Sequence, residues 1–396
     1  MRRLMLIGFL AVMTLPAGAA RRVTVAQLEQ ELNRAIAAHK TDQEIARRIA
    51  TLELSERLTA ATLGRLDGRL APGSQATLAL ALLADESAFL EAPAAESPNT
   101  AAPDDAEQSR MLNATRKYVA EALPSLPNFL ATRTIKRYDD TPQAAEKGGW
   151  GVRLGLHLVA TSNREISVRV ERENQPPAQG SAVWQEQIGL ISGGEFGTTL
   201  GMILADMSQG SVRWSSWEAT ASGLDAVFQY SVPRSASHFE VIGSRERTNL
   251  VGLGTVARGS SPSSLGVQPG DPSNTTIVRT RPSYHGSIWL DPATGSVLRI
   301  TMEADAKDGA PFERAGILVQ YGQVQIGDSK FICPIRSLAL SKAVPDPRAL
   351  YSDAPTEWLN ETIFSEYHRF ASTTRILNDS PAPPPEKPNG GTSTPH

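Results

Sequence analysis

Apolar residues recur at helical spacing between residues 21 and 124. Thr24 with Gln27, and Thr41 with Glu44, have the spacing of a capping box, in which two side chains satisfy free N–H groups at a helix start. Apolar side chains three and four residues apart follow each box. The pattern predicts a small N-terminal helical domain over residues 21–124, with a Pro- and Ala-rich linker at 92–104. The expected helices cover residues 24–36, 41–52, 58–66, 73–90 and 104–119.

Beyond residue 128 the apolar period changes to two, which is typical of strands with one buried face. The clearest hairpin spans residues 285–304, and its turn has Pro292 where φ is fixed and Gly295 where φ is positive. The expected fold class is α+β, with the helical domain followed at 125–378 by a curved antiparallel β-sheet. The expected strands cover residues 131–138, 152–160, 165–173, 212–219, 225–232, 238–242, 276–281, 285–290, 297–304, 316–321, 330–341 and 357–375.

Two segments interrupt this strand pattern, and a third follows its last strand. Residues 194–208 carry an apolar stripe at helical spacing, which predicts a helix packed into the curved sheet. Residues 252–276 are rich in Gly, Pro and Ser, so we expect a long mobile loop there. Residues 379–396 are rich in proline and lack large apolar side chains, so this tail is expected to be disordered.

The first 20 residues have the three parts of a secretory signal peptide. Arg2 and Arg3 precede an apolar run of twelve residues, and the small residues 17–19 then offer a cleavage site. The run is too short to span a bilayer, which needs about 20 residues. No later segment is long and apolar enough to do so. The sequence therefore predicts an exported protein, periplasmic or secreted, that is soluble after cleavage.

The charge and the cysteine content exclude several further kinds of function and site. The net charge of -3 becomes -5 when the two signal arginines are removed, which gives no electrostatic basis for binding nucleic acid. The single cysteine, Cys333, excludes an internal disulfide and a cysteine-based zinc site. Its place within an alternating apolar run favours a buried, inert thiol.

Motifs for catalysis and for cofactors are incomplete. His238 and Glu240 have the spacing of a zinc deaminase, but the cysteine that should accompany Cys333 is missing. Glu366 and His368 share a strand face and are the other candidate metal ligands. We therefore predict no catalytic residue, no metal site and no cofactor, although a dispersed pair of carboxylates would leave no local motif.

The segment 284–300, with its Asp291-to-Gly295 turn, resembles the central hairpin of periplasmic LolA-like proteins. Those proteins include outer-membrane lipoprotein carriers and a regulatory sensor of the cell envelope. Residues 126–129, 332–337 and 358–360 also resemble uncharacterised secreted acidobacterial proteins. The LolA-like resemblance implies a half-barrel with a plugging helix, whose concave apolar surface holds acyl chains or a lipidated partner.

The predicted function is non-catalytic binding of a hydrophobic ligand, either a lipid or a lipidated protein, within the concave sheet. One alternative is an interaction or scaffold protein that binds a protein partner through its N-terminal helices. The other is an envelope hydrolase with a dispersed site, which would require two carboxylates or a Ser–His pair to converge in a pocket. The predicted ligand-lining residues are Phe196, Leu200, Ile203, Trp214 and Trp289.

Overall fold

The computed structural model describes residues 21–142, 155–168, 190–191, 194–220, 223–246, 250–257, 275–306, 310, 312–343 and 356–369. The predicted signal peptide at 1–20 and the predicted tail at 379–396 lie outside these residues, as does most of the predicted loop at 252–276.

Four helices form an N-terminal unit: α1 (Val25–Ala37), α2 (Asp42–Ile49), α3 (Ala60–Asp67) and α4 (Gln75–Glu86). Both predicted capping boxes are confirmed at α1 and α2. Two short parallel strands, β1 (Arg21–Val23) and β2 (Leu52–Leu54), complete the unit. The sequence did not indicate them, because three residues are too few to show a period.

Helix α5 (Asp105–Ser125) follows a short 3₁₀ turn at Ala94–Glu96 and packs on the β-sheet. Its Met111 and Val119 belong to the apolar core of the sheet, which is distinct from the core of the N-terminal unit. Gly295, at a φ of 75°, lies so close to the helix that a Cβ there would be 2.6 Å from the Ala114 carbonyl carbon. The hairpin turn therefore supports α5 directly.

The main sheet is antiparallel and has nine strands in the order β4-β3-β15-β14-β13-β12-β11-β7-β6. The α+β class and the antiparallel sheet are confirmed, and the sheet is open, with β4 and β6 at its edges. Its strands are β3 (Phe129–Asp139), β4 (His157–Val168), β6 (Ser211–Thr220), β7 (Gly223–Val232), β11 (Tyr284–Leu290), β12 (Val297–Ala304), β13 (Phe312–Ile326), β14 (Ser329–Ala343) and β15 (Glu357–Arg369).

Two strand predictions differ from the structure. Residues 157–168 form one strand, whereas the sequence predicted strands at 152–160 and 165–173 with a break between them. The polar stretch 161–164 continues the strand because each of its residues pairs with β3. Residues up to Ala257 lie in β9 (Leu250–Ala257), so the first six residues of the predicted loop at 252–276 are in a strand.

A second sheet has the order β10-β8-β9-β5 and contains β5 (Leu190–Ile191), β8 (Phe239–Glu246), β9 and β10 (Thr275–Thr280). Strand β5 joins it to the main sheet through two side chains. The Leu190 N–H donates to Ser341 Oγ at 3.1 Å, and Asn360 Nδ2 donates to the Leu190 carbonyl at 2.8 Å.

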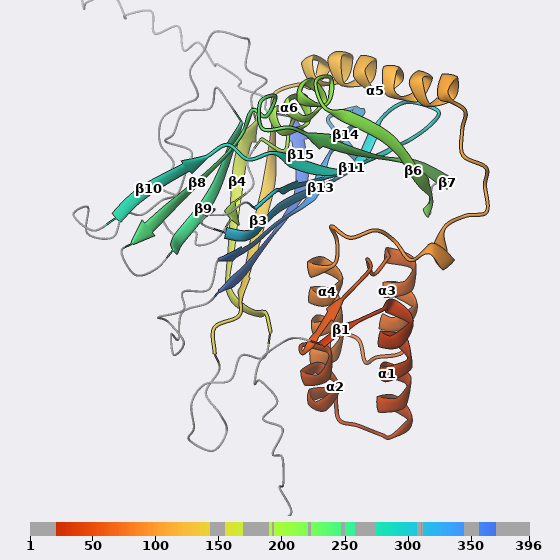
Figure 1. The fold of residues 1–396 in the computed structure, drawn as a ribbon, viewed down its shortest axis with the longest axis vertical. Helices are drawn as coiled ribbons and strands as arrows, with labels where there is room; N and C mark the ends of the chain where they lie inside the picture. The colour runs from red at the N-terminus through yellow and green to blue at the C-terminus, as the bar shows by residue number, and fades with distance from the viewer. Residues whose placement is uncertain are drawn as a thin grey trace, which may run out of the picture.

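The two faces of the main sheet are covered by different parts of the chain, because successive strand residues point to opposite faces. Ile317 and Val319 of β13 belong to the core that contains α5 and α6 (Thr198–Met207). Leu318, between them, packs with Leu82 and Ala88 of the N-terminal unit. Figure 1 shows this arrangement, with α5 and α6 above the sheet and the four N-terminal helices as a lobe below it.

Candidate functional site

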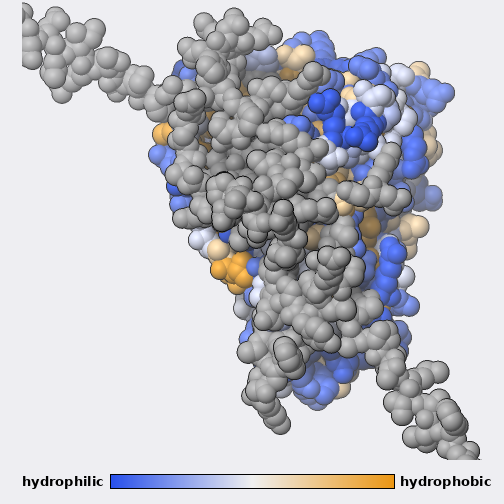
Figure 2. Space-filling model, turned by 60° about the vertical axis from the view of Figure 1, so that its left-hand side comes forward, coloured by the Kyte–Doolittle hydropathy of each residue, from blue (hydrophilic) through white to orange (hydrophobic). Residues whose placement is uncertain are grey.

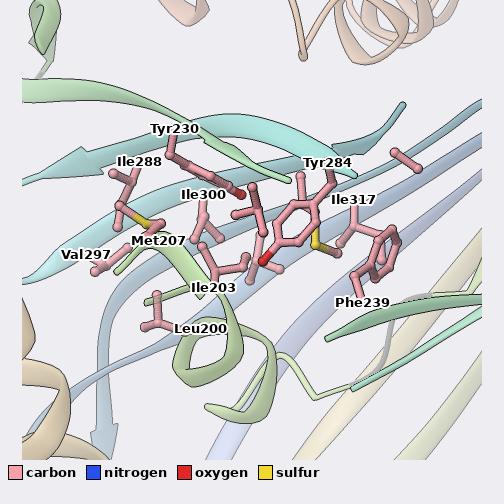
Figure 3. Close-up of a cluster of buried hydrophobic side chains, with 14 of the residues drawn as sticks. Leu200, Ile203, Met207, Tyr230, Phe239, Tyr284, Ile288, Val297, Ile300 and Ile317 are labelled. Carbon is pink, nitrogen blue, oxygen red and sulfur yellow. The ribbon is translucent and has the colours of Figure 1, made fainter. Parts of the chain in front are cut away.

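Helix α6 forms at its predicted place and buries its apolar stripe against the sheet. Ile203 is fully buried, and Leu200 is almost so. Figure 3 shows Ile203 pointing from the helix towards Ile300 of the sheet, with Leu200 on the side of Val297. Two of the five predicted lining residues are therefore core residues, and Leu200 also borders a cavity described below.

Phe196 and Trp214 lie in separate aromatic clusters. Phe196 precedes α6 and makes edge contacts with Phe129 and Phe364, at ring-centroid distances of 5.5 and 5.1 Å. Trp214 packs at 5.3 Å against Phe228 and at 4.9 Å against a neighbouring tryptophan on β6. The structure does not bring these two side chains together around one ligand.

Trp289 points to the opposite face of the sheet, where the N-terminal unit docks. Its Nε1 donates to Glu218 Oε2 at 2.7 Å. Arg57 and Arg299 place their guanidinium carbons 5.2 and 4.5 Å from its ring centroid, within the range of cation–π attraction. Arg57 also donates to both oxygens of Glu218. Trp289 therefore joins the two parts of the protein.

An apolar cavity lies between α5, the start of α6 and the hairpin of β13 and β14. Its volume is about 300 Å³. Sequence reasoning assigned only Leu200 to it, because it placed α5 with the N-terminal helices and so missed that side of the cavity. The lining residues are Tyr118, Val119, Ala122, Ser125, Leu126, Leu200, Val297, Tyr321, Gln323, Lys330, Phe331 and Ile332.

The hydrophobic surface outside this cavity is limited. Among the described residues, the five large apolar side chains that are exposed lie on four different elements, with two of them adjacent on β4. Figure 2 shows one face, on which the described surface is mostly hydrophilic with small apolar patches. The exposed large apolar side chains are those of Leu78, Leu158, Val159, Leu224 and Ile335.

A larger, polar cleft of about 570 Å³ separates residues 89–97 from β6, β7 and β11. Each of its three carboxylates binds a donor of the protein itself. Glu218 binds Arg57, Glu303 accepts from Arg314 at 2.9 Å, and Glu91 accepts from Gln229 at 2.6 Å. These acids are therefore engaged in structural contacts.

His285 also lines the polar cleft, and its Nδ1 lies 2.7 Å from Asp305 Oδ1. Among the described residues, no hydrogen bond joins His285 to a serine hydroxyl. The Ser–His pair that the hydrolase alternative requires is thus not formed at this histidine within the described part of the chain.

A buried carboxylate anchors the end of α6. Asp206 accepts from the His238 N–H at 2.9 Å and from the Tyr284 hydroxyl at 2.8 Å, and its other oxygen lies 2.5 Å from His238 Nδ1. Burial raises the pKa of Tyr284, so its hydroxyl remains a donor. His238, a predicted candidate ligand, is therefore held in a hydrogen-bonded group within the fold.

The candidate metal ligands near the end of β15 contact other groups of the protein. His368 Nδ1 lies 2.8 Å from the Glu366 carbonyl, and its Nε2 is 3.5 Å from Glu165. Within the described ranges, no three His, Cys, Asp or Glu side chains come together in a way that could hold a metal ion. Cys333 is buried, and burial raises its pKa to about 12, which keeps the thiol protonated and unreactive.

Replacing Asp225 with asparagine is expected to stabilise the protein above pH 6. Burial, and then the charge of Glu218, raise the pKa of Asp225 from 3.8 to about 6. The folded state therefore holds this proton more tightly, and the stability it contributes below pH 3.8 is lost as the pH rises through about 6. This difference between the unfolded and the folded pKa of Asp225 corresponds to at most about 3 kcal/mol of stability.

Urea unfolding at pH 4.5 and pH 7.5 tests the Asp225 prediction, with exposed Asp105→Asn as the control. The D225N variant should exceed the wild type in free energy of unfolding by up to about 3 kcal/mol at pH 7.5 and by only about 1 kcal/mol at pH 4.5. The same difference at both pH values would contradict the prediction.

Comparison with protein-family models, with curated proteins and with solved structures found no match. Within the described residues, no helix is both long and apolar enough to cross a membrane.

Proposed function

We propose that the protein binds a hydrophobic ligand in the apolar cavity between α5, α6 and the β13–β14 hairpin. The observation that carries the proposal is the lining, in which aliphatic and aromatic side chains surround about 300 Å³. This volume is at the lower end of the range for small-molecule sites, about 300–1,000 Å³, which are mostly apolar with a few polar groups.

The position of the cavity supports the proposal. It opens where two helices meet one face of an open antiparallel sheet, and α6 is seated on that face by Ile203 and Met207. A LolA-like half-barrel with α6 as its plugging helix would have this arrangement, and the resemblance of residues 284–300 agrees with it. The proposal includes export to the cell envelope, where the ligand would be a lipid or the acyl group of a lipidated protein.

A tryptophan at position 122 should fill the cavity and weaken ligand binding strongly. Ala122 lies on α5, lines the cavity and is half-buried, so a larger side chain there enters the space without disturbing the centre of the core. We expect Ala122→Trp to weaken the binding of a dansyl-labelled undecanoate about tenfold or more. The measurement is a fluorescence titration of the mature protein.

Ala120→Trp is the matched control for this experiment. Ala120 lies on the same helix but is exposed and does not border the cavity. The control variant should bind the probe as the wild type does. Equal loss in both variants, or no binding by the wild type, would contradict the proposed site.

A further inference from the structure

The apolar cavity has one cationic side chain at its rim. Lys330 lines the cavity and is exposed, and it forms no ion pair with the described residues. On the hairpin, Gln323 pairs with Ile332 and Gln325 pairs with Lys330. Because these two cross-strand pairs are two residues apart, Lys330 lies on the same face of the hairpin as Ile332, and it is the nearer of the two to the turn.

The surroundings of Lys330 leave its charge available. Glu121, on the nearest turns of α5, is 3.9 Å from its own partner Lys117. The hairpin turn contains one carboxylate, Asp328, and the side chain of Arg369 packs over Gly327 in the same turn. At the turn itself, two cations, Lys330 and Arg369, therefore accompany one acid, Asp328, whereas Glu366 and Glu165 on the neighbouring strands contact Thr132 and His368.

We propose that the ligand of the apolar cavity is a chain with a terminal carboxylate, whose head group binds Lys330 while its hydrocarbon tail lies against Leu200 and Val297. This inference rests on the proposed function. An apolar site lined by side chains of this kind excludes a charged head group from its interior, because an unpaired buried charge is costly. An ammonium group at the rim supplies the charge-assisted hydrogen bond that a carboxylate needs.

The test compares dodecanoate with 1-dodecanol, two probes that share the same chain and differ in charge. Isothermal titration calorimetry on the full mature chain at low salt should show that dodecanoate binds about fivefold more tightly than 1-dodecanol. Lys330→Met should remove this preference, so that dodecanoate and 1-dodecanol bind with similar affinity. Lys342→Met, on the same strand but away from the cavity, is the control and should keep the preference.

The outcomes separate this inference from the proposed function. Equal affinity of the wild type for the two probes, or a preference that survives in K330M, would overturn the carboxylate assignment while hydrophobic binding stands. Failure of both probes to bind would overturn the proposed function itself. A preference that falls as sodium chloride is raised would support the ion pair, because exposed charges are screened by salt.

Discussion

Replacing Arg336 with methionine is expected to lower the free energy of unfolding by about 3–5 kcal/mol at pH 7.5. Arg336 Nε donates to Glu361 Oε1 at 2.7 Å, and its Nη2 donates to both oxygens of Asp85 at 2.7 and 2.8 Å. Both acidic side chains are largely buried, with an exposed fraction of 12% each. Removing the cation leaves Asp85 without the donor that binds both of its oxygens, and leaves Glu361, among the described residues, with only Lys136 at 3.9 Å, which is the costly way to break a buried ion pair.

The loss in R336M should depend on pH in a defined direction. Burial raises the pKa of Asp85 to about 6, although Arg336 opposes this effect. Because this pKa lies above the ordinary value of 3.8, protonated Asp85 favours the folded state, and that contribution disappears as the pH rises through about 6. Without Arg336 the cost of ionising Asp85 grows, so R336M should be less destabilised at pH 5 than at pH 7.5.

Urea unfolding at the two pH values measures both parts of the Arg336 prediction. Lys342→Met is a suitable control, because Lys342 is a half-exposed cation on the same strand and lies 3.8 Å from the exposed Glu313. The control should change the free energy of unfolding by less than about 1 kcal/mol. An R336M variant as stable as this control would mean that the ion pairs do not join the N-terminal unit to the sheet.

Local signals in the sequence predicted much of the fold. The capping boxes at Thr24 and Thr41, the strand period from residue 128 and the apolar stripe of α6 each depend on residues within about ten positions of one another. Arg336 could not be interpreted in this way. Its partner Asp85 lies 251 positions away, and the sequence contains no pattern that pairs them.

The candidate site was predictable only in part for the same reason. Leu200 was found because the period of α6 marks its buried stripe, and that stripe meets the cavity. Trp289 was placed with it on composition alone, yet the alternation along β11 directs this side chain to the other face. The contribution of α5 was missed, because its apolar side chains show that it packs but not which element it packs against.

Replacing Asp206 with alanine is expected to destabilise the protein by about 3–5 kcal/mol, within the range for leaving buried polar groups without partners. Asp206 accepts hydrogen bonds from β11 through Tyr284 and from the turn before β8 through His238. The side chain of Asp206 is fully buried, so water cannot replace it. The variant should therefore loosen α6, and with it the Leu200 wall of the apolar cavity.

Tyr284→Phe separates the role of the carboxylate from that of one donor. This variant keeps the ring that packs against Phe239 at 5.6 Å and leaves Asp206 with the two His238 contacts. It should therefore cost only about 1–2 kcal/mol. Urea unfolding, monitored by near-ultraviolet circular dichroism, gives the free energies of unfolding of both variants. Titration with dansyl-undecanoate measures how well the cavity still binds the probe. If D206A were no less stable than Y284F, the carboxylate would not be the anchor of α6. If D206A were less stable but bound the probe with unchanged affinity, the seating of α6 would not shape the cavity.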